Sequence, residues 1–193
     1  MIDDKTLDIL LRKARSHSDF TDRDVSDETL RAIYDLAKWG PTTANSQPQR
    51  IVFVRGAEAK ERLRPALSAT NVKKTLAAPV VAIFAFDMSF YEHIPRFYTN
   101  PQARSWYETT PEAIRTHSLR NATLQAAYFM LSARALGVDC GPMSGFKNDV
   151  VDAEFFPDGR YRSNFLCCLG YGDPASLGPQ LPRFDFDEVC EVV

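Results

Sequence analysis

The hydrophobic and polar positions of this chain follow two periods, one typical of strands and one typical of helices. Continuous apolar segments predict buried strands at residues 50–55 and 80–86 and a buried strand and turn at 164–173. Apolar residues at helical spacing predict helices that cover residues 6–15, 26–38 and 111–136, and residues 147–156 are helix-like. The charged segment 58–64 is predicted as a solvated helix. Glycine and proline follow the second helix at Gly40 and Pro41, and Gly137 ends the long fourth helix.

Each of the three more apolar helices has a predicted buried face. Ser26, followed by two acidic residues, is a helix cap. The first helix has its apolar face at Leu7, Leu10, Leu11 and Ala14, and the second at Leu30, Ile33, Leu36 and Ala37. The long helix repeats apolar residues at Leu119, Leu124, Ala127, Tyr128, Leu131 and Ala135. Because Phe129 and Met130 are apolar too, we expect this helix to be buried on more than one side.

Length and composition indicate one α/β or α+β domain that covers residues 1–193, with 45% hydrophobic and 25% charged residues. A net charge of −2 without a basic cluster argues against nucleic acid as a partner. No apolar stretch has membrane-spanning length and the N-terminus is polar, so we expect a cytoplasmic protein without membrane contact. The four cysteines and three histidines lack metal-ligand spacing. Cys167 and Cys168 lie in an apolar run, which predicts buried thiols.

Two stretches hold candidate binding chemistry. Residues 39–48, Trp-Gly-Pro-Thr-Thr-Ala-Asn-Ser-Gln-Pro, offer hydroxyls and amides without charge, which suits neutral hydrogen bonds to a flat polar ring, or simply a helix-to-strand turn. Arg15-Ser-His-Ser18 can clamp a phosphate, although an arginine at a helix C-terminus also complements the helix dipole. The aromatic segment 89–111 is equally compatible with a flap over a pocket, a subunit interface and a small packed core.

Several of these segments resemble, in order, the motifs of the FMN-dependent nitroreductase family. They are Arg15-Ser-His-Ser-Asp-Phe20, Pro41-Thr-Thr-Ala-Asn-Ser-Gln-Pro48, Asn71-Val-Lys-Lys74, Gly141-Pro-Met-Ser-Gly-Phe146 and the late arginine Arg183. The resemblance implies an α+β fold with a central, mostly antiparallel sheet flanked by helices, and an intertwined homodimer built around the long helix. Ala14 and Ser18 stand where the family often has basic residues, and Ser144 where many relatives have glutamate.

The resemblance also implies an FMN site. Its motifs would place cofactor contacts on Arg15, Ser16, His17, Pro41, Thr42, Thr43, Asn45, Ser46, Asn71, Lys74, Pro142, Met143, Ser144, Gly145 and Arg183. In this reading Arg15, Ser16 and Arg183 bind the phosphate, with His17 beside them. Asn71 and Lys74 reach the pyrimidine edge, where a cation stabilises the reduced ring. Residues 142–145 approach flavin N5 through their backbone. The sequence has no Gly-x-Gly-x-x-Gly motif of a dinucleotide-binding fold, so NADH or NADPH would visit as a transient reductant in ping-pong turnover.

Within the family the chain looks closest to the malonic semialdehyde reductase group of pyrimidine degradation, which overlaps proteins named NADH dehydrogenase/NAD(P)H nitroreductase. That group is implied to reduce 3-oxopropanoate to 3-hydroxypropanoate. Asn45, Arg104 and Arg120 are the candidates for binding such an acidic acceptor. A broad-specificity nitro or quinone reductase is the alternative, and a flavin-binding protein without turnover is the alternative from another class.

Overall fold

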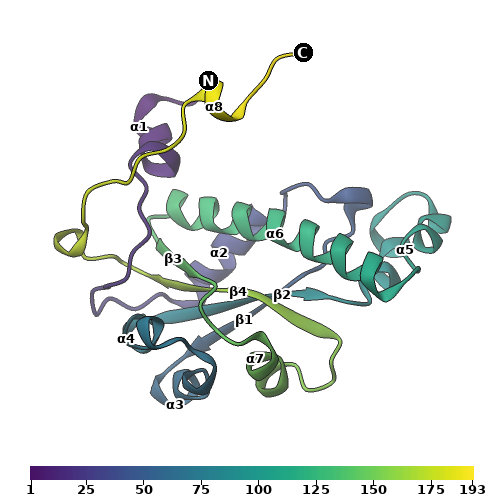
Figure 1. Ribbon diagram of the computed structural model, residues 1–193, viewed down its shortest axis with the longest axis horizontal. Coiled ribbons are helices and arrows are strands. Elements are labelled where there is room, and N and C mark those ends of the chain that lie inside the picture. Colours follow the sequence, from purple (N-terminus) through teal and green to yellow (C-terminus); the bar gives the residue numbers. More distant parts are fainter.

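The centre of the molecule is a four-stranded antiparallel sheet with the strand order β1-β2-β4-β3 (Figure 1). The computed structural model describes residues 1–193 apart from the side chain of Pro101. The strands are β1 (Gln49–Arg55), β2 (Val80–Asp87), β3 (Asp139–Met143) and β4 (Tyr161–Gly170). The three predicted strands are confirmed, as is the α+β class. β3 was not predicted, because Gly141 and Pro142 interrupt its apolar pattern.

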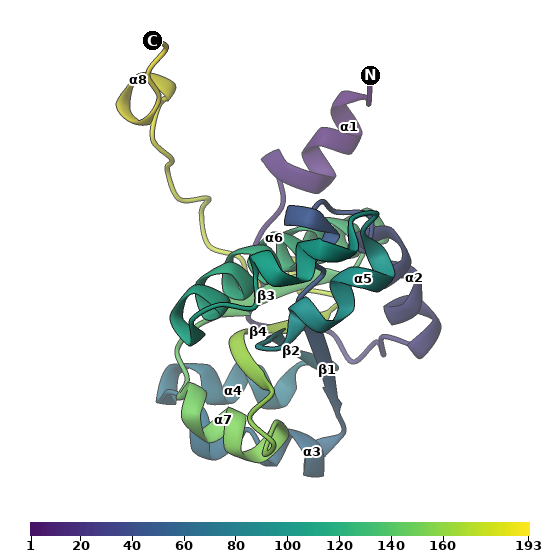
Figure 2. The same cartoon turned by 90° about the vertical axis from the view of Figure 1, so that its right-hand side faces the viewer.

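Helices cover both faces of this sheet (Figures 1 and 2). One face carries α2 (Asp27–Ala37) and α6 (Pro111–Ala135), and the other carries α3 (Ala57–Glu61), α4 (Ala69–Ala77) and α7 (Asn148–Phe155). Successive side chains of a strand point to opposite faces. The even-numbered residues 80–84 of β2 therefore join the core under α2 and α6, whereas the odd-numbered residues 81–85 join the core on the other face. Two covered faces explain why β2 is apolar throughout.

The two predicted helices at 26–38 and 58–64 differ from the structure in detail. Ser26 caps α2 as predicted, since its hydroxyl accepts from the Thr29 N–H at 3.2 Å. Leu36 was predicted in the core but is 49% exposed, so that assignment is wrong. The predicted solvated helix at 58–64 is shorter, because α3 ends at Glu61 and Leu63 is buried. The remaining core residues of α2 are buried as predicted.

The long helix α6 is confirmed in extent but not in orientation. Thr110 caps it through a hydrogen bond from the Ala113 N–H, and Gly137 follows it with a φ of 75°. Its buried residues are Ile114, Ser118, Asn121, Ala122, Gln125, Ala126, Phe129 and Ala133. The predicted core positions Leu124 and Tyr128 are 47% and 41% exposed, and Ala127 and Ala135 are exposed too, so these four were assigned to the wrong face. Small alanines on the other face let the helix approach the sheet closely.

Both ends of the chain leave the body of the molecule (Figure 2). α1 (Asp4–Leu7) continues into a π-helical turn, Asp8–Arg12, where one helix was predicted over 6–15. None of these residues is buried, and Leu11 is 57% exposed. The C-terminal tail contains α8 (Phe186–Val189) and exposes the large side chains of Leu181, Phe184, Phe186, Val189 and Val192. Arg15 holds the start of this tail through the carbonyls of Gly178 and Pro179, at 2.8 and 3.2 Å.

The aromatic segment 89–111 contains a small core of its own. It forms a 3-10 turn (Phe90–His93), α5 (Ile94–Phe97) and a second 3-10 stretch (Pro101–Trp106). Phe90, Ile94 and Ala103 are buried there. Of the three sequence interpretations, the packed core is therefore confirmed for the buried part. Phe97, Tyr98 and Trp106 remain exposed, which leaves the flap and the interface open for them.

A buried carboxylate fixes the end of β2 beside this segment. Asp87 is fully buried, and its carboxylate accepts from Arg50 Nη2 at 2.7 Å, Arg160 Nε at 3.2 Å and the Ser89 N–H at 2.8 Å. Its carbonyl accepts from Ser118 Oγ of α6 at 2.8 Å. These bonds join β1, β2 and α6 next to the loop that precedes β1.

In the part of the chain that the structure describes, no helix combines the length and apolar character needed to cross a bilayer.

Candidate functional site

The residues predicted to bind a phosphate come together at one end of the sheet. Arg15, Ser16 and Arg183 line one hollow of about 560 Å³, together with Arg12 and Arg134. Among the side chains that the structure describes, neither Arg15 nor Arg183 makes an ion pair. Their guanidinium groups bond only to backbone carbonyls of the tail. The hollow therefore combines a hydroxyl with unneutralised arginines, which is the chemistry that binds a phosphate.

His17 adjoins this hollow but points into the protein. Its side chain is buried, with Nε2 3.5 Å from Asp139 Oδ1, and its Nδ1 has no hydrogen-bond partner among the described residues. The backbone N–H of His17 donates to the backbone carbonyl of Cys140 at 3.0 Å. Gly141 and Gly172 leave the space that this segment occupies: a Cβ at Gly172 would lie 1.9 Å from His17 Nδ1, and one at Gly141 2.2 Å from the His17 carbonyl oxygen. His17 thus forms the wall behind Arg15 and Ser16.

Two further predicted segments meet on the face of the sheet that carries α4. Asn71 Nδ2 donates to the carbonyl of Gly145 at 2.9 Å, and the Ser68 N–H donates to the same oxygen at 3.0 Å. Met143 Sδ accepts from Thr75 Oγ1 at 3.6 Å. These bonds join the start of α4 to the segment 142–145, which consists of the last two residues of β3 and the two residues after it. The structure therefore brings Asn71 next to the segment that contains Pro142, Met143, Ser144 and Gly145.

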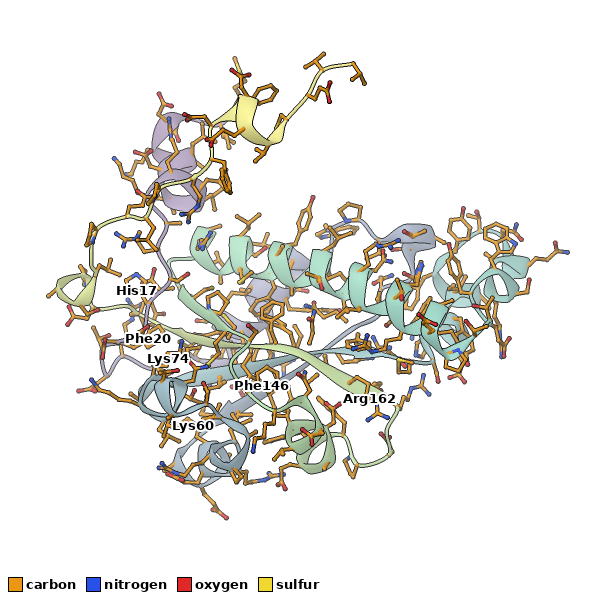
Figure 3. The ribbon with its side chains drawn as sticks, viewed as in Figure 1. His17, Phe20, Lys60, Lys74, Phe146 and Arg162 are labelled. Atoms are coloured by element: carbon orange, nitrogen blue, oxygen red, sulfur yellow. The ribbon has the colours of Figure 1, made fainter. Side chains whose placement is uncertain are left out.

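Lys74 lies one turn after Asn71, on the same end of the molecule as His17 and Phe20 (Figure 3). Its side chain is partly exposed, and its ammonium makes no ion pair among the described side chains, whereas the neighbouring Lys73 pairs with Asp19 at 3.6 Å. Behind it, burial raises the pKa of the Cys168 thiol to about 12, and the positive charge of Lys74 offsets part of that rise. Lys74 is thus a cation available to a ligand beside Asn71 and Gly145.

The loop 41–48 lies against α6, on the opposite face of the sheet from α4 (Figure 1). The Thr43 N–H donates to Asn121 Oδ1 at 2.8 Å, and Ser46 Oγ lies 3.4 Å from His117 Nε2. Pro41, Thr43 and Asn45 are exposed, Thr42 is half-buried and Ser46 is buried. Within one chain, therefore, this predicted group does not meet the group around Asn71 and Gly145.

The α6 residues that hold this loop were missed in the sequence. His117, Asn121 and Gln125 reach Ser46, Thr43 and Gln49, respectively, and the Gln49 N–H donates to Gln125 Oε1 at 3.0 Å. The available signal was the spacing of these polar residues, which recur every four positions along the helix. The periodicity of apolar residues, on which the helix was predicted, does not reveal such a polar stripe.

The three predicted acceptor contacts differ in their surroundings. Arg104 is held by Glu108 through two hydrogen bonds of 3.0 Å, and this carboxylate raises the pKa of the Arg104 guanidinium. Arg120 lines an open hollow with Thr116 and His117 and makes no ion pair among the described side chains. Asn45 Nδ2 donates to the carbonyl of Phe97 at 3.0 Å. Arg120 is therefore the arginine whose charge is available to an anion.

Comparisons with known proteins agree on one family. The model of the nitroreductase family matches residues 11–171. A Burkholderia lata protein named "Putative NADH dehydrogenase/NAD(P)H nitroreductase" is 51% identical over 191 residues, which cover 99% of this chain and 98% of that protein.

Two solved structures have the same fold. The Bacillus subtilis protein titled "putative nitroreductase ydfN" superposes with a TM-score of 0.87 at 27% identity, covering 95% of this chain and 97% of the other. A structure from Exiguobacterium sibiricum, titled as a putative nitroreductase in complex with FMN, gives a TM-score of 0.87 at 22% identity and covers 100% of this chain and 98% of the other. Since the family model spans most of the chain and one relative shares half of its residues, this chain belongs to the nitroreductase family.

Proposed function

We propose that this protein is an FMN-dependent oxidoreductase that takes electrons from NADH or NADPH and passes them to a small acceptor. The observation that carries the proposal is the pairing of two sites at one end of the sheet. A hollow with unpaired arginines lies at the termini, and an amide and a free ammonium lie at α4. An FMN molecule requires such a pair, one for its phosphate and one for its ring.

The donor set fits this cofactor in charge and in chemistry. A phosphate monoester carries close to two negative charges, which Arg15 and Arg183 balance, and Ser16 adds a hydroxyl. Asn71, Lys74 and the exposed backbone of Ser144 and Gly145 offer donors to the carbonyl and ring nitrogen atoms of a flavin. His17 supports the phosphate site from behind, because its side chain is buried.

When bound, FMN supplies the hydride chemistry, in which the ring accepts and releases two electrons. The protein's own residues bind and orient it and set its electrostatics. Lys74 stabilises negative charge on the pyrimidine edge of the ring, which favours its reduced form. Asn71 holds the carbonyl of Gly145 and so keeps the segment 142–145 against the site.

We propose further that the working unit is an intertwined homodimer with one domain, residues 1–193, in each chain. The predicted ring-contacting loop 41–48 and the predicted group at Asn71 lie on opposite faces of the sheet, so a second chain is needed to place both at one flavin. The exposed side chains of Leu124, Tyr128 and Trp39, the last 80% exposed, supply an apolar surface for that contact. The apolar tail that leaves the body is suited to wrapping a partner.

The first test is cofactor binding. Purified protein should be yellow, and added FMN should lose fluorescence on binding. Arg15→Ala and Arg183→Ala should each weaken binding roughly ten- to a hundredfold, since a charge-assisted bond contributes about 1.5–3 kcal/mol. Arg62→Ala is the control, because Arg62 pairs with Glu154 at 2.6 Å on the surface. Protein that neither carries nor binds FMN would refute the proposal.

The second test concerns the assembly. Light scattering at low micromolar concentration should give twice the chain mass of 21.7 kDa. The substitution Tyr128→Glu places a charge on the exposed apolar face of α6 and should weaken the dimer and FMN binding together. Arg115→Glu, also on the exposed surface of α6, is the control for dimerisation. A monomer that keeps FMN and activity would show that one chain completes the site.

For the acceptor we propose malonic semialdehyde, which is reduced to 3-hydroxypropanoate. The available charge of Arg120 suits a small carboxylate better than that of Arg104, which Glu108 already neutralises.

Initial rates with NADH and NADPH against malonic semialdehyde, nitrofurazone and menadione decide between this acceptor and a broad nitro or quinone specificity. Parallel double-reciprocal lines are expected, because both reactants use one site in turn. Arg120→Gln should raise KM for malonic semialdehyde and leave KM for menadione unchanged. Absence of turnover with every acceptor would favour a flavin-binding protein.

A further inference from the structure

The loop 41–48 has a strained backbone although it contains no glycine after residue 40. Ala44, Asn45 and Gln47 have φ angles of 49°, 49° and 43°. Residues other than glycine and asparagine rarely adopt this left-handed backbone conformation, so contacts from outside the loop must maintain the conformation. Within the loop only short-range bonds support the turn, among them the Gln47 N–H to Thr42 Oγ1 at 3.2 Å.

Two outside contacts lie near the strained residues themselves, since Asn45 Nδ2 donates to the Phe97 carbonyl at 3.0 Å and Arg50 Nη1 to the Gln47 carbonyl at 3.1 Å. The others come from one line of side chains on α6. His117, Asn121 and Gln125 follow each other at intervals of four residues and therefore share one side of the helix. Asn121 and Gln125 are 1% and 8% exposed. They bind the backbone N–H groups of Thr43 and Gln49, at 2.8 and 3.0 Å, on either side of the strained residues.

The hydrogen-bond partners of Asn121 define the state of His117. Thr43 N–H can only donate, so it faces Oδ1 of Asn121, and the His117 carbonyl can only accept, so it faces Nδ2 at 2.9 Å. The same Nδ2 lies 3.2 Å from His117 Nε2. Because Nδ2 donates, this contact is a hydrogen bond only if Nε2 accepts, which places the imidazole proton on Nδ1. Ser46 Oγ approaches the same Nε2 at 3.4 Å.

We propose that His117, Asn121 and Gln125 are positioning residues that hold the loop 41–48 in its strained, ring-facing conformation, and that this hold requires His117 to be neutral with its proton on Nδ1. A proton on Nε2 would face the amide nitrogen of Asn121, donor against donor. The amide would then have to leave either the His117 carbonyl or Thr43. The proposal depends on the proposed function only in the statement that the loop faces a flavin.

The surroundings of His117 keep it neutral at physiological pH. Its ring stacks on Phe90 with a centroid separation of 4.8 Å and an angle of 15°, and Tyr107 covers it at 4.4 Å. Burial, and secondarily the charge of Arg120, lower the pKa of His117. The groups beside the ring are thus Tyr107, which follows the second 3-10 stretch, and Arg120 from α6 itself, with neutral Phe90 and Ser46. The loop should be released only in acid, below the ordinary histidine pKa of about 6.5.

The tautomer is measured directly by nitrogen-15 NMR of the imidazoles in the apo protein. The chain has three histidines, so His117→Gln identifies the signal of His117 by its loss. We expect a neutral ring with its proton on Nδ1 at pH 7. A proton on Nε2 would overturn the proposal.

Hydrogen exchange of the Thr43 and Gln49 amides, corrected for the intrinsic rate at each pH, measures the hold itself. Asn121→Leu should speed exchange at Thr43 about fivefold, the equivalent of one neutral hydrogen bond. Gln125→Met should do the same at Gln49, and it keeps the test decisive if the first variant does not fold. Thr123→Ala is the control, since Thr123 is exposed on α6 and bonds Leu119 and Asn164 instead. Unchanged exchange in Gln125→Met and in any folded Asn121→Leu protein would refute the anchoring.

The acid response distinguishes His117 from a purely structural residue. In the wild type, corrected exchange at Thr43 should rise as the pH falls through the lowered pKa of His117. In His117→Gln the side-chain oxygen can accept from Asn121 without titrating, so exchange should stay flat. FMN affinity of the dimer should fall in acid in both proteins, because the phosphate monoester gains a proton near pH 6. The wild type should show an additional loss relative to His117→Gln. If the wild type binds no FMN, the proposed function fails while the tautomer and the exchange still decide this inference. An acid response that persists in His117→Gln would overturn the role of His117.

Discussion

The substitution Gly141→Ala should damage the fold and the phosphate site together. Gly141 lies in β3 opposite Cys168, and an added Cβ would be 2.2 Å from the backbone carbonyl oxygen of His17. Gly141 has no positive φ, so the effect is one of space alone. Real Cβ contacts begin near 3.0 Å, so His17 and β3 would have to part by about 0.8 Å, the difference between 3.0 and 2.2 Å.

This displacement has two energetic consequences. Forcing a methyl group into a packed site costs about 1–3 kcal/mol. The hydrogen bond from the His17 N–H to the Cys140 carbonyl, 3.0 Å long, would also be stretched, which removes about 1 kcal/mol. We therefore expect a loss of about 2–4 kcal/mol in the free energy of unfolding. Because Arg15 and Ser16 precede His17 directly, they move away from the phosphate, and FMN affinity should fall about tenfold or more.

Urea unfolding of the apo protein, followed by circular dichroism, measures the stability, and quenching of FMN fluorescence measures the affinity. Gly178→Ala is the matched control, since a Cβ there meets nothing within 4 Å. A Gly141→Ala protein within about 0.5 kcal/mol of the wild type would refute the steric reasoning. Lost stability with unchanged FMN affinity would instead remove Arg15 and Ser16 from the phosphate site.

Four further outcomes are expected. Asp87→Asn should lower the free energy of unfolding by about 3–5 kcal/mol, because Arg50 and Arg160 lose a buried partner. Asp35→Asn, which disrupts an exposed pair with Lys38, should cost less than about 1 kcal/mol. Equal losses of the two variants in urea unfolding would contradict the role of the buried Asp87. Lys74→Met should lower the flavin reduction potential on the order of 30 mV, for about 1.4 kcal/mol of lost charge stabilisation in a two-electron couple. Lys73→Met, which removes a lysine paired with Asp19, should leave the potential unchanged. Equal potentials of Lys74→Met and the wild type in dye-equilibration titrations would return Lys74 to the solvated surface. Because the pKa of His117 is lowered in the folded state, the unfolded chain binds more protons, so stability should fall as the pH drops from about 6.5 to the lowered pKa and then level off; urea midpoints across this range should decline less in His117→Gln. Burial raises the pKa of Cys168 to about 12, and Cys140 and Cys167 are also buried, so a thiol reagent at pH 8 should label only Cys190 before denaturation; rapid labelling of a second cysteine would contradict the buried assignment.

Much of the architecture was readable from local pattern. The apolar run of β2 could be predicted because both of its faces are covered, and the cap Ser26 because it bonds a backbone group within the same turn. The buried state of Cys167 and Cys168 followed from their apolar neighbours. The family motifs also located the segments around Arg15, Asn71 and Gly145, which the fold brings to one end of the sheet. These features depend on residues that are neighbours in sequence or on motifs that are contiguous.

Tertiary structure alone decided the features that depend on distant partners. α6 has two apolar faces, and helical periodicity cannot say which one meets the sheet; the small residues Ala122 and Ala126 allow the close approach, so Leu124 and Tyr128 remain outside. The polar side chains of Asn121 and Gln125 can be buried because they bind the N–H groups of Thr43 and Gln49. These partners lie more than seventy residues away in the chain, so local pattern does not reveal them. His17 turns inward because Gly141 and Gly172 leave room for it. The sequence by itself determined the elements and the chemical groups that they present, whereas the packing of those elements determined which groups face each other, because a hydrogen bond or a close contact exists only when both partners are in place.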